Sequence, residues 1–137
     1  VEASGNTREI LKSGDSEAVS PDGSFMVYRK GSAESGDYYF YRMNLSDGEE
    51  RLLTKKSGVW TTVSPDGKWV VYTRYGELTG IWKVSVEGGE PLPVLNENAT
   101  SPAISPDGKI IAFIWRRAGH PNQIALASLN GGEIIKT

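Results

Sequence analysis

The sequence predicts an all-β fold, a β-propeller, from three observations. The tetrapeptide Ser-Pro-Asp-Gly occurs three times, beginning at Ser20, Ser64 and Ser105, with a spacing of 44 and then 41 residues. Apolar residues between these motifs follow the period of two that is typical of strands, and no window favours a helix longer than one turn. The 137 residues include 16 glycines and 7 prolines, as a turn-rich chain requires.

Each repeat contains four short strand patterns, in the order expected for one propeller blade. A short apolar segment precedes each Ser-Pro-Asp-Gly motif, and it is found at 18–19, 62–63 and 103–104. A β-branched and aromatic run follows the motif at 25–28, 69–72 and 110–113. After a polar gap, a third run occupies 38–45, 81–86 and 124–129 and ends in a glycine turn. The fourth strand is predicted at 51–53, 92–94 and 134–136.

The chemistry of the motif predicts a tight hairpin turn between the first two strands of each blade. Proline presets φ, the aspartate carboxylate accepts bonds from nearby backbone N–H groups, and glycine supplies a positive φ. The three aspartates could instead form a metal or catalytic set, but each lies in a different blade and its own turn explains it. The structural turn residues are Pro21, Asp22, Gly23, Pro65, Asp66, Gly67, Pro106, Asp107 and Gly108.

The repeat divides the chain into three blades of about 14–56, 57–97 and 98–137. Residues 1–13 lie before the first complete repeat, and 7–12 resemble a fourth strand. We expect this terminal strand to belong to a preceding blade or to a blade of a partner chain, where 133–137 would compete for the same position.

The second blade carries the motifs of a known family. Ser64-Pro65-Asp66-Gly67 is followed by a Lys-Trp-Val-Val-Tyr-Thr run at 68–73, by Ile-Trp-Lys-Val at 81–84 and by Gly-Gly-Glu at 88–90. With its counterparts in the other two blades, this pattern resembles the TolB-like β-propeller repeat over residues 14–137. The resemblance implies a bacterial propeller that recognises ligands, and it favours a periplasmic or other extracytoplasmic location. The family also supplies propellers to prolyl-oligopeptidase-type peptidases, tricorn-like proteases and kinase-linked sensors.

Three blades are fewer than the six or more with which TolB-like propellers usually close. Each blade buries its faces only against its neighbours, so an arc of three would leave two apolar faces in water. Two such arcs joined head to tail about a two-fold axis would give six blades with no open face. We therefore expect self-association as a homodimer, with each chain supplying a half-propeller.

The composition favours a protein that is not an enzyme and that holds no cofactor or metal. There is no cysteine and one histidine, which leaves no metal-ligand spacing of those residue types. The sequence contains neither a serine nucleophile elbow nor a glycine-rich phosphate loop. A net charge of −2 gives no basic excess for nucleic acid, and no apolar run is long enough for membrane insertion.

The remaining candidate site is the surface formed by the loops between the second and third strands and by the connections between blades. These loops share one end of a propeller, and their cations make a locally positive surface suited to a carboxylate-bearing peptide or another acidic ligand. The alternative is a set of solvated charges. The candidate residues are Arg29, Lys30, Arg74, Tyr75, Arg116, Arg117 and His120. The four tryptophans, Trp60, Trp69, Trp82 and Trp115, are predicted to pack between blades rather than to contact ligand.

We therefore expect a non-catalytic scaffold that recognises a protein or ligand on its loop surface. One alternative is the propeller of a peptidase of the prolyl-oligopeptidase or tricorn type, which gates access without doing chemistry. Another is a sensor module of a kinase-linked or membrane-linked bacterial protein.

Overall fold

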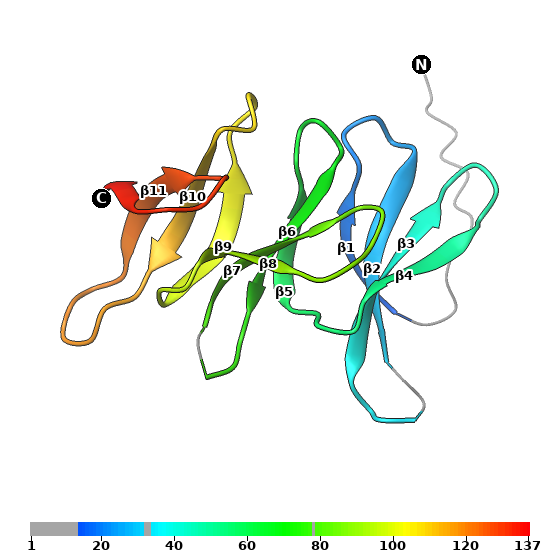
Figure 1. Cartoon of the computed structure of the whole chain (residues 1–137), viewed down its shortest axis with the longest axis horizontal. Coiled ribbons are helices and arrows are strands. Elements are labelled where there is room, and N and C mark those ends of the chain that lie inside the picture. Colours follow the sequence, from blue (N-terminus) through cyan, green and yellow to red (C-terminus); the bar gives the residue numbers. More distant parts are fainter. Residues whose placement is uncertain (1–13, 32–33, 78) are drawn as a thin grey trace, which may run out of the picture.

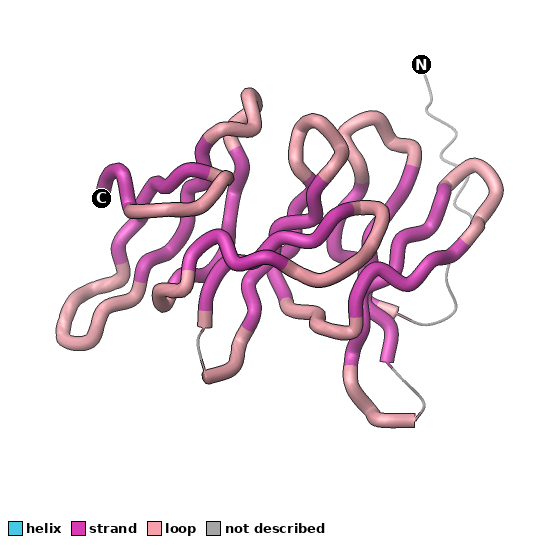
Figure 2. The backbone as a smooth tube through the Cα atoms, viewed as in Figure 1, coloured by secondary structure: helices cyan, strands magenta, loops and turns pink. Residues whose placement is uncertain are grey.

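The computed structural model describes residues 14–31, 34–77 and 79–137, and these residues form strands and turns without a helix (Figure 2). The strands make three antiparallel sheets of four, each a simple meander. Blade 1 contains β1 (Asp15–Val19), β2 (Phe25–Gly31), β3 (Tyr38–Asn44) and β4 (Glu50–Thr54). Blade 2 contains β5 (Val59–Val63), β6 (Trp69–Arg74), β7 (Gly80–Ser85) and β8 (Leu92–Leu95). Blade 3 contains β9 (Ala99–Ile104), β10 (Ile110–Trp115), β11 (Gln123–Ser128) and β12 (Ile134–Lys136).

This architecture confirms the predicted all-β propeller with three four-stranded blades, and a strand lies at each of the twelve predicted positions. The blades stand side by side in sequence order, with the end of the chain on the outer strand of blade 3 (Figure 1). The predicted terminal strand at 7–12 lies outside the described residues. Closure of two chains into a six-bladed ring stays a prediction.

The Ser-Pro-Asp-Gly turns adopt the predicted hairpin geometry. In blade 2, the Gly67 amide donates to the Ser64 carbonyl at 2.8 Å, and Gly67 has a φ of 70°. Ser64 Oγ donates to Asp66 Oδ1 at 2.5 Å and accepts from the Trp69 amide at 3.0 Å. The three equivalent turns lie together at one end of the blades, which we call the turn face (Figure 1).

Side chains alternate between the two faces of each blade, so consecutive blades bury one face of each against the other. We call the face toward the following blade the leading face and the opposite one the trailing face. The leading face of blade 1 presents Val27 and Phe40 to Val70 and Tyr72 on the trailing face of blade 2. The Phe40 and Tyr72 rings meet edge to face, with centroids 4.9 Å apart.

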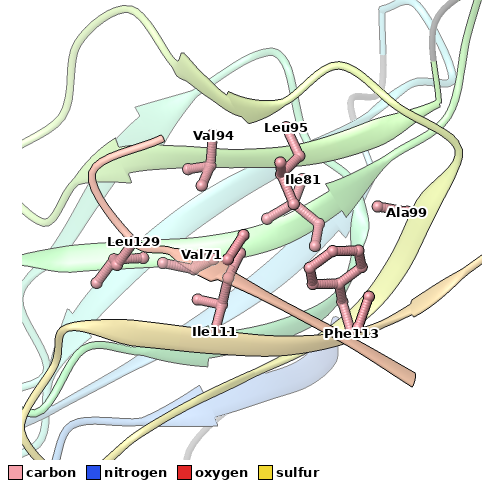
Figure 3. Packing of buried hydrophobic residues seen from close by; sticks show 10 residues of the cluster. Val71, Ile81, Val94, Leu95, Ala99, Ile111, Phe113 and Leu129 are labelled. Carbon is pink, nitrogen blue, oxygen red and sulfur yellow. The ribbon is translucent and has the colours of Figure 1, made fainter. Parts of the chain in front are cut away.

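The second interface repeats this arrangement between blades 2 and 3. Val71 and Ile81 on the leading face of blade 2 pack against Ile111 and Phe113 on the trailing face of blade 3 (Figure 3). All four side chains are at most 2% exposed. Most of the hydrophobic core of the described residues therefore lies in two interblade layers, as the repeat predicts, and a smaller cluster of Met26, Tyr28 and Met43 lies on the trailing face of blade 1.

The prediction that all four tryptophans pack between blades is wrong for one of them. Trp69, Trp82 and Trp115 are partly buried against the interblade clusters. Trp60 is 46% exposed, because it lies at an irregularity in the pairing of β5 with β6 and has a φ of 52°. A positive φ interrupts the strand alternation and turns this side chain toward solvent.

Candidate functional site

The candidate site lies at the end of the blades opposite the turn face. The loops that join the second and third strands of each blade lie there, at about 32–37, 75–79 and 116–122 (Figure 1). We call this end the loop face. Unlike the turns, these loops share no common sequence, so each blade presents different side chains.

On blade 1, the predicted cations are held by carboxylates of their own sheet. Arg29 is paired with Asp15 at 3.2 Å and with Glu17 at 2.7 Å, both on the adjacent strand β1. Lys30 is paired with Glu50 at 2.9 Å. Because a ligand would have to displace these partners, blade 1 contributes less positive charge to the loop face than its sequence suggests.

On blade 2, Arg74 has a different environment. It ends β6 and stacks its guanidinium over the Trp82 ring, 4.7 Å from the ring centroid. Within the described part of the chain it forms no ion pair with a carboxylate. A guanidinium that lies over an aromatic ring can keep N–H groups available for a planar acceptor such as a carboxylate.

Trp82 adds a second donor beside this guanidinium. Its indole Nε1–H is buried and has no hydrogen-bond partner in the described structure. The great majority of buried side-chain donors in proteins are paired, so this one is unusual, but it has almost no accessible surface and is not exposed to the cavity.

Tyr75 and Trp60 provide exposed aromatic surface next to these donors. Their rings meet edge to face, with centroids 5.8 Å apart, and Tyr75 is 51% exposed. Two amphipathic rings held against each other at a surface give a rigid contact area with little loss of side-chain entropy on binding.

A cavity of about 340 Å³ lies beside these groups, and the described residues of its wall are Arg74, Tyr75, Gly76, Glu77 and Trp82. The cavity is open to solvent, and these residues give it one cation, one carboxylate and aromatic surface. This combination can bind a short segment that presents a carboxylate to Arg74 and a donor to Glu77, with an apolar group on the rings.

On blade 3, each candidate residue makes its own separate contacts. Arg117 stacks on Trp115 at 4.3 Å and donates from Nη2 to Gln123 Oε1 at 2.6 Å. The amide of Arg116 donates to the Asn98 carbonyl at 2.9 Å, and the amide of His120 to the Arg117 carbonyl at 3.1 Å. The imidazole of His120 is exposed.

The predicted residues therefore divide into three groups. Arg74 and Tyr75 line one cavity, Arg29 and Lys30 are neutralised within blade 1, and the blade 3 residues lie beside a different loop. The sequence missed the contributions of Glu77, Trp60 and Trp82. The predicted hairpin could have revealed Trp82. It pairs with Tyr72, two residues before Arg74, so Trp82 and Arg74 lie on the same face of the sheet.

The turn aspartates are structural in this arrangement. Hydrogen bonds from the Ser24 hydroxyl and amide and from the Ser20 hydroxyl lower the pKa of Asp22 to about 2. The pKa values of Asp66 and Asp107 are lowered in the same way, first by the hydroxyls of Ser64 and Ser105. The described residues contain no group of three or more potential metal-ligating side chains. They also contain no helix of the length and apolarity needed to cross a membrane.

Comparisons with known proteins agree on the fold. TolB from Acinetobacter baumannii superposes with a TM-score of 0.72 at 26% identity, over 88% of this chain and 31% of that one. A protein provisionally named TolB from Agrobacterium tumefaciens gives 0.76 at 24% identity, over 93% and 50%. The β-propeller domain of the Trilobed protease from Pyrococcus furiosus gives 0.65 at 18% identity, over 91% and 42%.

These structures share the propeller fold, and the chain spans from 31% to 50% of their length. No protein-family profile matches the chain, and no curated protein resembles it significantly in sequence.

Proposed function

We propose that this chain is a non-catalytic recognition module of the TolB-like repeat family, and that it binds carboxylate-bearing peptide segments at the loop face of blade 2. The observation that carries the proposal is the guanidinium of Arg74, which forms no ion pair within the described part of the chain and lies over the Trp82 ring at the wall of an open cavity. The extracytoplasmic location implied by the resemblance belongs to the same proposal.

The chemistry of the cavity favours a peptide over a small inorganic anion. An anion would use Arg74 but would be repelled by the Glu77 carboxylate, which lines the same cavity. A peptide end can satisfy both groups, and its side chain can cover the exposed rings of Trp60 and Tyr75.

The test is a titration of short peptides that contain one aromatic residue, each made with a free and with an amidated C-terminus. The intrinsic fluorescence of the tryptophans reports binding. We expect the free-carboxylate peptides to bind and the amides to bind at least about tenfold more weakly, because a charge-assisted hydrogen bond is worth about 1.5–3 kcal/mol.

Arg74→Ala is expected to remove this difference between free and amidated peptides. The matched control is Arg117→Ala, because Arg117 stacks on a tryptophan in the same way but donates to Gln123. Equal binding of both peptide forms by the wild type would refute the proposed carboxylate site. Hydrolysis of the peptides by the chain would refute the non-catalytic role.

The gating alternative predicts a different result. A propeller that only restricts access to a separate catalytic domain needs no affinity for peptide ends at its loop face. Uniformly weak, sequence-independent binding that survives Arg74→Ala would favour gating over recognition.

A further inference from the structure

Most surface aromatic rings of this chain are covered by its own cations. Among the described residues, six tyrosine and tryptophan rings that keep some exposed surface each have an arginine or lysine 4.3–5.7 Å from the ring centroid. These rings are Tyr38, Tyr39, Tyr41, Trp69, Trp82 and Trp115. The face of an aromatic ring is electron-rich and attracts a cation. Covering an exposed ring in this way is therefore a general feature of the molecule.

Trp60 and Tyr75 are the two exceptions within the described ranges. Trp60 is 46% exposed and Tyr75 is 51% exposed, and no arginine or lysine of those ranges lies over either ring. The two rings contact each other edge to face instead. Both belong to blade 2, which packs against blade 1 on one side and blade 3 on the other. Their exposure therefore does not arise at an end of the arc.

Glu77 adds a negative charge beside these rings. It is exposed and lines the same cavity as Tyr75. It takes part in none of the ion pairs formed by residues 14–31, 34–77 and 79–137. An unpaired carboxylate and an uncovered ring face both attract a cation, and the described residues supply none to either.

The size of the cavity limits what can bring this cation. Its volume of about 340 Å³ is at the lower end of the range for ligand sites, about 300–1,000 Å³, so it suits one residue better than a long segment. At the carboxylate site proposed above, the ligand already brings a negative charge to Arg74. A C-terminal residue with a cationic side chain supplies both charges, so that Arg74 faces the carboxylate and Glu77 faces the cation.

We infer that the blade 2 cavity recognises peptides that end in arginine, with that side chain stacked on the Trp60–Tyr75 pair and its guanidinium bonded to Glu77. The inference rests on the proposed carboxylate site and adds the identity of the terminal side chain to it. Arginine fits better than lysine because its planar guanidinium stacks on aromatic rings and presents paired N–H groups to a carboxylate. The chain itself places arginine over tryptophan in this way at Trp82 and at Trp115.

The first test compares four peptides by isothermal titration calorimetry with the whole chain. All four are acetylated at the N-terminus and differ only at the last residue, which is arginine or its uncharged isostere citrulline, each as the free acid and as the amide. We expect the arginine acid to bind about three- to thirtyfold more tightly than the citrulline acid, because citrulline loses both the ion pair and the cation–π contact.

The four peptides separate the two claims. Equal binding of the arginine and citrulline acids, with both acids binding more tightly than their amides, overturns the inference and leaves the carboxylate site intact. Equal binding of acids and amides refutes the carboxylate site, and with it the placement of the arginine at the peptide end.

A matched pair of variants locates the cation. Glu77→Gln keeps the size of the side chain and should remove most of the preference for arginine, while the acids still bind more tightly than the amides. Glu97→Gln is the control, because it removes the same charge from an exposed glutamate in the connection between β8 and β9. This control should retain both differences. A preference for arginine that survives Glu77→Gln overturns the inference.

Trp60→Ser tests the contact with the ring. Ser101 lies at the equivalent backbone position in blade 3, with a φ of 59° against 52° for Trp60, so a serine fits this backbone. We expect the variant to lower the preference for arginine over citrulline by about two- to fivefold, the contribution of an exposed cation–π contact. An unchanged preference would overturn the stacking of the arginine on this pair.

Discussion

The turn face repeats one arrangement three times, whereas the loop face carries a different set of side chains on each blade. The serine hydroxyl donates to the turn aspartate at 2.8, 2.5 and 2.6 Å in blades 1, 2 and 3. At the loop face, the sixth residue pair of the hairpin between the second and third strands contains Lys30 in blade 1, Arg74 in blade 2 and Trp115 in blade 3. The turns are determined by local hydrogen bonding that admits few sequences, while the loops are free to differ, so the loop face is where binding specificity can arise.

The largest expected effect comes from the loop-face end of β7, where a neighbouring backbone approaches closely. A Cβ added at Gly80 would lie 2.2 Å from the Leu95 carbonyl oxygen, which cannot move without breaking the β7–β8 pairing. We expect Gly80→Ala to destabilise the fold by about 3 kcal/mol, the upper part of the usual range for overpacking. Thermal unfolding followed by circular dichroism measures this.

The matched variant is Gly31→Ala, at the loop-face end of β2. Among the described residues its added Cβ would have one neighbour, a Tyr38 ring carbon at 4.0 Å, and Gly31 does not have a positive φ. We expect a change within about 0.5 kcal/mol. Equal losses for Gly80→Ala and Gly31→Ala would show that backbone crowding does not distinguish the two loops.

A smaller effect tests whether the three turns are equivalent in energy as they are in geometry. Ser64 is 1% exposed, so Ser64→Ala would leave the Trp69 amide without its acceptor in a buried place, at a cost of about 1–2 kcal/mol. Ser105 makes the same bonds in a more exposed turn, where water can replace them, and Ser105→Ala should cost about 0.5 kcal/mol. Urea unfolding midpoints compare the two variants. The same midpoint shift for both would mean that burial is irrelevant to the turn.

The smallest effect is the pH dependence that the turn aspartates produce. The pKa of Asp22 is about 2 in the folded chain, below the 3.8 of an unperturbed aspartate, so the ionised carboxylate binds the turn more strongly than the protonated form does. Its contribution is complete above 3.8 and is lost as the pH falls toward about 2. We expect the melting temperature of Asp22→Asn to fall less steeply than that of the wild type over this interval. Parallel profiles would contradict the role of the carboxylate.

The strands and turns could be predicted because their determinants are local. The run at 69–72 alternates in the period that puts Val70 and Tyr72 on one face and Val71 on the other, and the structure has them so. The site was predicted only in part. The pairing of Arg29 with Asp15 and Glu17 follows from a strand register that brings residues from both sides of a turn together. Composition alone does not reveal such a pairing.

The exposure of Trp60 was also not predictable from the local sequence. Its sequence context is that of a strand, yet its positive φ turns the indole toward Tyr75 and solvent. Residue 101, at the equivalent place in blade 3, also has a positive φ, but there it is a serine. Two blades share the backbone feature and only one carries an aromatic ring on it.

By itself the sequence determined the number of blades, the position of each strand and the geometry of the turns, because hydrogen bonds and side-chain alternation within about forty residues specify them. Only the tertiary structure decided which cations are neutralised and which indole lines the cavity. Those properties depend on contacts between strands and between blades, where the free energy of a charged or apolar group is set by whatever packs against it rather than by its own place in the repeat.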